Sequence, residues 1–127
     1  MSTFVGNKTI KFLKNNKSLL RNLIEKCEFF QKNLNNFLKI NKIDAKVYRF
    51  QSILRIVFSN KNVSSRLQRD FLEKRKASKI SNLREYLLKK GIYYPNNGII
   101  FFSTATSEKS IKTLLKYLKI KLKKDFK

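Results

Sequence analysis

The stretch that decides the fold is residues 83–118, LREYLLKKGIYYPNNGIIFFSTATSEKSIKTLLKYL. It opens as an amphipathic helix, which we expect to end at Gly91 because glycine readily takes the positive φ of a helix C-terminus. A turn is predicted at Asn96-Asn97-Gly98. The apolar segment 99–102 that follows is typical of a strand buried on both faces, and a second amphipathic helix closes the stretch.

The two helices of this stretch have recognisable N-termini and apolar stripes. We expect Ser78 or Ser81 to cap the first helix and Thr106 to cap the second, with Glu108 in the first turn favoured by the helix dipole. The positions expected to face the interior are Ile80, Leu83, Tyr86 and Leu87 in the first helix, and Ile111, Leu114, Leu115, Leu118 and Leu122 in the second.

The N-terminal third predicts a long helix from about Lys8 to about Asn41, with a possible break at residues 15–16. Such a helix with one apolar stripe needs a surface to lie on, and a sheet is the candidate. The stripe consists of Leu20, Leu23, Ile24, Cys27, Phe30, Leu34, Phe37 and Leu38.

Two strand-like segments, 45–50 and 52–58, come next and are rich in β-branched and aromatic residues. Only Gln51 separates them, so a bent strand, a bulge and a hairpin are all open. Residues 59–78 are polar and are interpreted as a long connection with a helical turn at 67–74.

These elements predict an α+β fold, in which a small antiparallel or mixed sheet is covered by helices. We expect residues 1–44 to form a long connector helix region and residues 45–127 a small α+β domain, the two making one folding unit. A chain of 127 residues is long enough for an ordinary hydrophobic core.

The composition points to a protein of a reducing compartment. A single cysteine excludes an internal disulfide, no apolar run approaches the length of a membrane span, and no secretory signal is recognisable. The expectation is therefore a cytoplasmic protein without a membrane partner.

The net charge of +22 has two interpretations. Only 7 of the 30 basic residues are arginine, and the abundance of Lys, Asn, Ile and Phe fits an A/T-rich coding bias. The alternative is an α+β module that binds RNA or another polyanion, with Tyr93 and Tyr94 as stacking groups or as anchors of the turn against the sheet. The basic residues proposed for that role, besides the Lys-rich tail, are Arg66, Arg69, Lys74, Arg75 and Lys76.

The sequence contains no recognisable catalytic centre. The absence of histidine excludes the usual serine triad and His-containing metal sites, and one cysteine excludes a CxxC motif. Glu25 and Glu28 are expected on a solvated helix face, and Cys27 in the core. We therefore predict no catalytic residue and no metal site in this chain.

Four segments carry a family resemblance: SILRIVF at 52–58, GIYYP at 91–95, IIFFSTATSEKSI at 99–111, and the closing helix. Their order resembles the C-terminal small domain of class III pyridoxal-phosphate-dependent aminotransferases, in particular the branch of glutamate-1-semialdehyde 2,1-aminomutase, an isomerase. The helix upstream is similar to the connector into that domain.

The resemblance implies a fragment that lacks the cofactor lysine and is inactive alone. It would be either a subunit of a split enzyme, which docks on a separate large domain or on a homodimer partner, or a remnant without activity. No cofactor is expected in this chain, whereas a complete enzyme of the family holds pyridoxal phosphate. The one cofactor contact that the resemblance transfers is Thr3, toward the phosphate in a neighbouring subunit.

Overall fold

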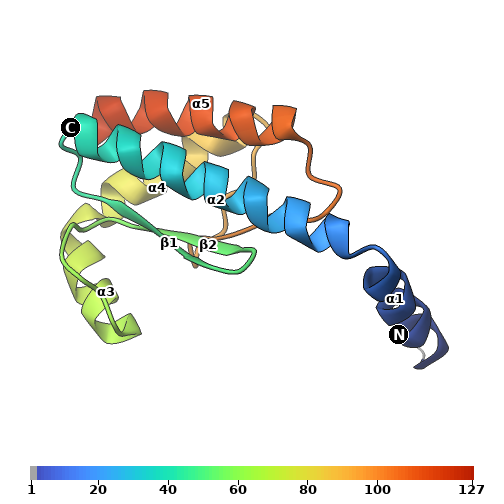
Figure 1. Cartoon of the computed structure of the whole chain (residues 1–127). Coiled ribbons are helices and arrows are strands. Elements are labelled where there is room, and N and C mark those ends of the chain that lie inside the picture. Colours follow the sequence, from blue (N-terminus) through green and yellow to red (C-terminus); the bar gives the residue numbers. More distant parts are fainter. Residues whose placement is uncertain (1–2) are drawn as a thin grey trace.

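The computed structural model describes the backbone of residues 3–127 and their side chains, except those of residues 3–5 and 13. A three-stranded antiparallel sheet carries helices α2, α4 and α5 on one side, while α1 and α3 extend beyond the other side at opposite ends (Figure 1). The predicted α+β class is confirmed. The elements are α1 (Thr3–Asn15), α2 (Lys17–Ile40), β1 (Lys46–Phe50), β2 (Ile53–Val57), α3 (Arg66–Glu73), the 3₁₀ helix η1 (Lys74–Lys76), α4 (Ala77–Lys89), β3 (Ile99–Phe101) and α5 (Glu108–Asp125).

The predicted N-terminal helix is broken where the sequence suggested. Asn16 separates α1 from α2, and its side-chain amide donates to the Phe12 carbonyl at 2.8 Å. Helix α1 begins at Thr3, five residues before the predicted start at Lys8. Leu20 was expected in the apolar stripe but is 43% exposed, because the first turns of α2 project past the sheet (Figure 1).

Strands β1 and β2 form a hairpin, which decides among the three alternatives left by the sequence. Phe50 pairs with Ile53, so Gln51 and Ser52 are the whole loop. Gln51 has a φ of 55°, as the first central position of a tight hairpin turn permits. The long connection after β2 contains α3, which matches the predicted helical turn at 67–74.

Strand β3 pairs antiparallel with β2 only, so it is an edge of the sheet. The prediction that this segment is buried on both faces is wrong, because Phe101 is 67% exposed while Ile100 is buried. An uninterrupted apolar run does not reveal which face is covered, since a helix layer on one side buries only alternate residues.

The helix caps differ by a few residues from those predicted. Ser107, not Thr106, caps α5, and its side chain accepts from the backbone N–H of Ser110. Helix α4 has no serine cap at either predicted position, because η1 leads directly into it and supplies its first turn. Its end at Gly91, with a φ of 79°, is as predicted.

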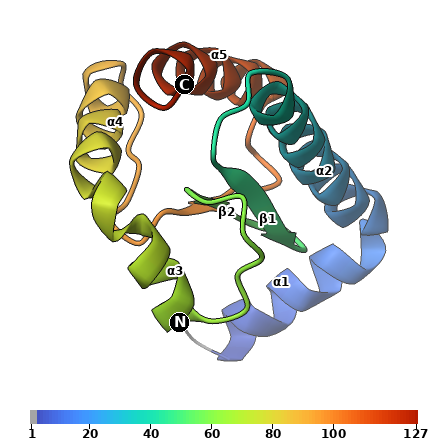
Figure 2. The same ribbon diagram turned by 90° about the vertical axis from the view of Figure 1, so that its left-hand side faces the viewer.

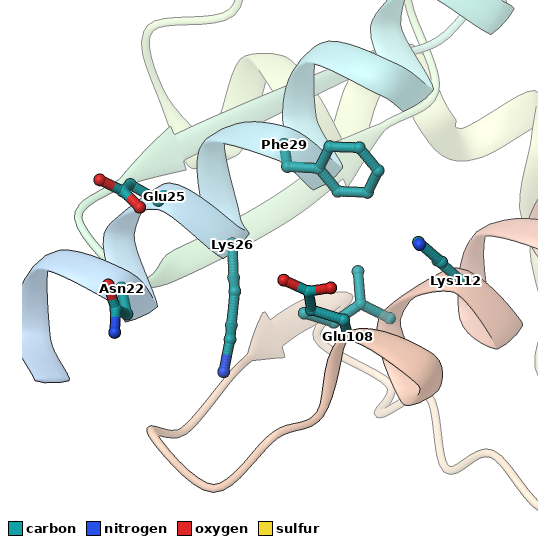
Figure 3. A pocket seen from close by; sticks show the side chains of 7 residues that line it. Asn22, Glu25, Lys26, Phe29, Glu108 and Lys112 are labelled. Atoms are coloured by element: carbon teal, nitrogen blue, oxygen red, sulfur yellow. The ribbon is translucent and has the colours of Figure 1, made fainter.

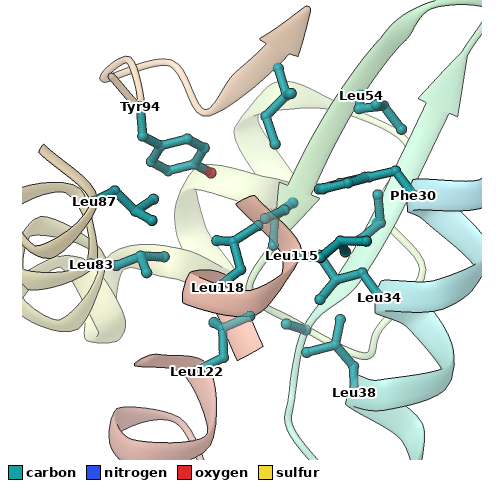
Figure 4. Close-up of a cluster of buried hydrophobic side chains, with 14 of the residues drawn as sticks. Phe30, Leu34, Leu38, Leu54, Leu83, Leu87, Tyr94, Leu115, Leu118 and Leu122 are labelled. Atoms are coloured by element: carbon teal, nitrogen blue, oxygen red, sulfur yellow. The ribbon is translucent and has the colours of Figure 1, made fainter. Parts of the chain in front are cut away.

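The core lies between the sheet and the layer of α2, α4 and α5 (Figure 4). Leu34 of α2, Leu118 of α5, and Leu83 and Leu87 of α4 all lie in this core. Phe30 packs edge-on against Phe102, with ring centroids 5.3 Å apart. The stripes predicted for α4 and α5 are thus largely correct, with Tyr86 and Leu114 half-buried at their borders.

Candidate docking surface on the open face of the sheet

The two faces of the sheet differ in how far the rest of the chain covers them. On the inner face alternate strand residues point into the core, whereas the outer face lies open between α3 and α1 (Figure 2). A sheet face that meets water is normally polar. Here the outer positions are mostly apolar or aromatic, and they are Lys46, Tyr48, Phe50, Ile53, Arg55, Val57, Ile99 and Phe101.

Three of these residues form a continuous exposed row across the strands. Phe50 pairs with Ile53, and Ile53 pairs with Phe101. Directly paired side chains on one face lie about 4.5–5.5 Å apart at Cβ, so the three form one surface. They are 74%, 40% and 67% exposed, respectively. We call Phe50, Ile53 and Phe101 the apolar row.

The next row contains Tyr48, Arg55 and Ile99. The Tyr48 hydroxyl accepts from the backbone N–H of Val63 at 3.3 Å, which ties the start of the long connection to the sheet. Arg55 stands at the centre of the middle strand, and its buried Nε has no hydrogen-bond partner among the described residues. The row therefore places one unpaired cation beside the apolar row.

The surroundings of Arg55 are crowded and partly basic. A Cβ placed on Gly98 would lie 3.8 Å from an Arg55 Nη and 3.2 Å from the Tyr94 hydroxyl, so the guanidinium lies against this turn. Burial lowers the pKa of Arg55, and the neighbouring positive charge of Arg69 adds to the shift, with Glu73 opposing it. No carboxylate of the described chain forms an ion pair with Arg55 within 4 Å.

Tyr94 and Tyr93, the two candidate stacking groups, have opposite environments. Tyr94 is buried at 6% exposure, its hydroxyl is 3.5 Å from the Gly98 carbonyl, and burial raises its pKa. Tyr94 therefore anchors the turn, which is the second of the two roles considered from the sequence. Tyr93 is 80% exposed.

The five basic residues predicted for polyanion binding lie together on α3 and η1, but most of them have intramolecular partners. Arg66 and Arg69 both pair with Asp70, and Arg69 also lies 3.9 Å from Glu73. Hydrogen bonds from Arg69, the largest cause, lower the pKa of Asp70. These contacts leave fewer cations free for a polyanion than the sequence indicated.

Lys76 has a structural role instead of a free charge. Its ammonium donates to the Asp44 carboxylate at 2.6 Å, to the Asp44 carbonyl at 3.0 Å and to the Phe58 carbonyl at 2.7 Å. It joins the loop after α2, the end of β2 and η1. In the described chain, Lys74 and Arg75 are the members of the predicted set that make no ion pair.

More exposed apolar side chains stand on the two helices that flank the open face. Leu67 and Phe71 of α3 are 83% and 78% exposed, and Ile10 and Phe12 of α1 are 53% and 58% exposed. Thr3, the predicted phosphate contact, is the first residue of α1, and its side chain lies outside the described residues.

A groove of about 450 Å³ lies between α2 and the start of α5 (Figure 3). Phe29 and Ile111 form its apolar part, and residues of both charges surround it. The Lys26 ammonium is bound to the Thr106 carbonyl at 2.9 Å, so it is not free for a ligand. This groove is open and of mixed charge, and it assembles no catalytic pair.

The residues weighed as catalytic groups have the environments that the sequence predicted. Cys27 is fully buried, and burial raises its pKa. Glu25 and Glu28 are exposed, with Glu28 3.4 Å from Arg49. The residues with described side chains contain no metal-binding group of His, Cys, Asp and Glu, and no described helix is both long and apolar enough to cross a membrane.

Comparison with known proteins agrees with the fold-level prediction. No family model matches the sequence, and no curated protein is similar to it. An omega-transaminase from Sphaerobacter thermophilus has a similar structure, with a TM-score of 0.67, and the match covers 85% of this chain. The chain shares the fold of one part of a transaminase. The sequence identity is 14%, and the chain spans about a quarter (24%) of the transaminase.

The resemblance implies a cofactor that is held by a lysine, so the environments of the lysines of this chain bear on it. A lysine that forms a Schiff base is activated by desolvation or by a neighbouring cation. None of the lysines here, all of which have described side chains, is buried. None of them therefore has the desolvated environment of a lysine in an apolar pocket.

Proposed function

We propose that this chain is the small domain of a class III pyridoxal-phosphate-dependent aminotransferase or aminomutase, of the glutamate-1-semialdehyde aminomutase type. It would dock, through the open face of its sheet, on a large cofactor-binding domain that lies outside these 127 residues. The observation that carries this proposal is an exposed apolar row on a domain whose fold recurs as a quarter of a transaminase.

The four resembling segments occupy elements of the sheet and of the helix layer that covers its inner face. SILRIVF contains β2, the middle strand; GIYYP and the turn after it lead into β3; and the cap after β3 starts α5. The resemblance thus involves the ordered elements of the sheet and its covering layer, which supports a structural relationship beyond composition.

The proposed role is positional. A small domain that closes over an active site can exclude water and hold the substrate without donating a catalytic group. Burying the apolar row against a partner is worth roughly 1.5–3 kcal/mol for each fully covered large side chain, so this row alone could stabilise closure.

The test begins with the reading frames beside this one. The large cofactor-binding chain encoded there is purified, titrated with the present chain, and assayed for aminotransferase activity in the mixture. We expect a complex, activity that depends on both chains, and loss of both with Ile53→Asp. Ile40→Asp is the matched control, because Ile40 is 79% exposed at the far end of α2. If no such chain exists or none binds, the split-enzyme proposal fails and an inactive remnant is left.

A second candidate function, binding of RNA or another polyanion, is favoured by two observations. The net charge is +22, and Lys74, Arg75 and Tyr93 are exposed. Since Arg66, Arg69 and Lys76 are held by carboxylates of the same chain, we rank it second.

A further inference from the structure

The open face contains one charged group, the guanidinium of Arg55, that an apolar partner could not cover without a cost in free energy. Arg55 has a buried Nε with no hydrogen-bond partner in the described chain, and the like charge of Arg69 near it is opposed by Glu73 and Asp70, neither of which forms an ion pair with Arg55. Covering this face with a purely apolar surface would remove the remaining water from the guanidinium. A buried cation without a partner is strongly disfavoured. The occupant of the face must therefore bring an acceptor.

We propose that Arg55 makes the open face selective for a carboxylate. The protein segment that docks there presents an Asp or Glu side chain to Arg55 and apolar side chains to Phe50, Ile53 and Phe101. Arginine and carboxylate match in planar, bidentate geometry, which gives this contact both strength and orientation. The inference rests on the proposed function in that it uses the same face.

Charge identifies the kind of partner. Each chain carries 30 basic residues against 8 acidic ones, so a second copy would bring like charges together at this face. An acidic protein surface with an apolar centre is complementary to the face in both respects. A nucleic acid would match the charge, but would leave the apolar row uncovered.

The position of Arg55 fixes where the carboxylate must lie. It is on the middle strand, one cross-strand row from the apolar row, with Gly98 and Tyr94 on its other side. The charged contact is thus adjacent to the apolar contact, and a ligand with a short apolar chain and one carboxylate can reach both.

Hexanoate is the probe for the test, and its binding to the intact chain is followed by NMR of backbone amides and arginine Nε–Hε groups. Hexan-1-ol carries the tail without charge, acetate the charge without a tail, and hexylammonium the opposite charge. We expect hexanoate to bind about tenfold more tightly than hexan-1-ol or acetate, and to shift the signals of Ile53, Arg55 and Phe101. Hexylammonium should not bind at this face.

Two variants with the same change in net charge sharpen the test. Arg55→Gln should reduce the preference for hexanoate over hexan-1-ol to less than about twofold. Arg75→Gln should keep it, because Arg75 is an exposed arginine on η1 without an ion pair in the described chain. Circular dichroism checks that both variants are folded.

The proposal would be overturned if hexanoate and hexan-1-ol bound equally well, or if inorganic phosphate outcompeted hexanoate at Arg55. It would also be overturned if the preference for hexanoate over hexan-1-ol survived in Arg55→Gln, or if Arg75→Gln lost that preference to the same extent. A concentration-dependent dimer in sedimentation, abolished by Ile53→Asp, would also overturn it by identifying a second copy as the occupant. The probe test needs no large domain. Hexanoate selectivity without binding to the large chain would therefore contradict the proposed function and leave this inference standing.

Discussion

The inner and outer faces of the same three strands are stabilised in different ways. The inner face is packed by three amphipathic helices, and Leu54, at its centre, is fully buried. The outer face is covered only at one end, where α3 and η1 are tied to the sheet by polar contacts such as that of the Phe58 N–H with Glu73 at 3.0 Å. Both faces are largely apolar, but within this chain the outer face is covered only at that end. Apolar patterning thus shows that a face needs cover, not that the chain supplies it.

The largest expected effect is a difference in stability between substitutions at two neighbouring residues of β2. Leu54→Ala should lower the free energy of unfolding by about 2–5 kcal/mol, because it leaves a cavity in the core. Ile53→Ala, on the exposed outer face, should lower it by about 1 kcal/mol or less. Urea unfolding followed by circular dichroism measures both values. Equal losses would show that the outer face is packed, and the contrast between the faces would be lost.

The second prediction concerns the polar attachment of η1. Lys76→Met should destabilise the fold by roughly 1–3 kcal/mol, since it leaves two carbonyls and a carboxylate without their donor. Lys74→Met is the matched control and should change stability by less than about 0.5 kcal/mol. Thermal unfolding of the two variants compares them, and equal effects would mean that Lys76 is an ordinary surface charge.

The third prediction is a pH dependence at the same attachment. Burial raises the pKa of Asp44, but the hydrogen bonds from Lys76 and the Asn60 N–H together lower it below its ordinary value. A lowered pKa stabilises the fold above the unfolded-state pKa, and this contribution is lost as the pH falls through the folded-state pKa. Asp44→Asn should therefore be less stable than wild type at pH 7, by under about 1 kcal/mol because the carboxylate is half exposed. The two proteins should converge in stability as the pH falls through the lowered pKa of Asp44, measured as urea midpoints against pH.

The smallest effect is expected for the binding of RNA and its dependence on salt. Binding should weaken steeply between about 50 and 200 mM salt and be no tighter than that of an equally basic protein. Exchanging both Lys74 and Arg75 for Gln should reduce the salt slope by at most about 2, as removal of two phosphate contacts would. Filter binding across a salt series measures this. Tight binding that persists at 200 mM salt would favour the polyanion function over docking of a protein.

The regular parts of the fold were predictable because their signals are local. Helical spacing of leucines marks α4 and α5, Gly91 ends a helix through its backbone freedom, and Asn16 interrupts the long N-terminal helix. The caps of α4 and α5 were misplaced, since serine and threonine are frequent near both starts and the final choice depends on how the preceding segment enters the helix.

The candidate site was much less predictable. The spacing of Arg69 and Glu73 on one helix allowed an ion pair to be expected, but nothing in the spacing reveals that Lys76 is held by Asp44, which lies 32 positions away. Arg55 was not singled out either. The available signal was one arginine at an outward position in a strand of apolar residues, and its meaning depends on which neighbours it lacks.

The sequence by itself determined the α+β class, the order of the main elements and most of the residues that the helices contribute to the core, because each follows from local periodicity and turn chemistry. Only the tertiary structure decided that β1 and β2 form a hairpin, that β3 is an edge strand, and that one sheet face remains open. The physical reason is that alternation in a strand assigns residues to two faces, whereas the packing of distant helices determines which of those faces is buried.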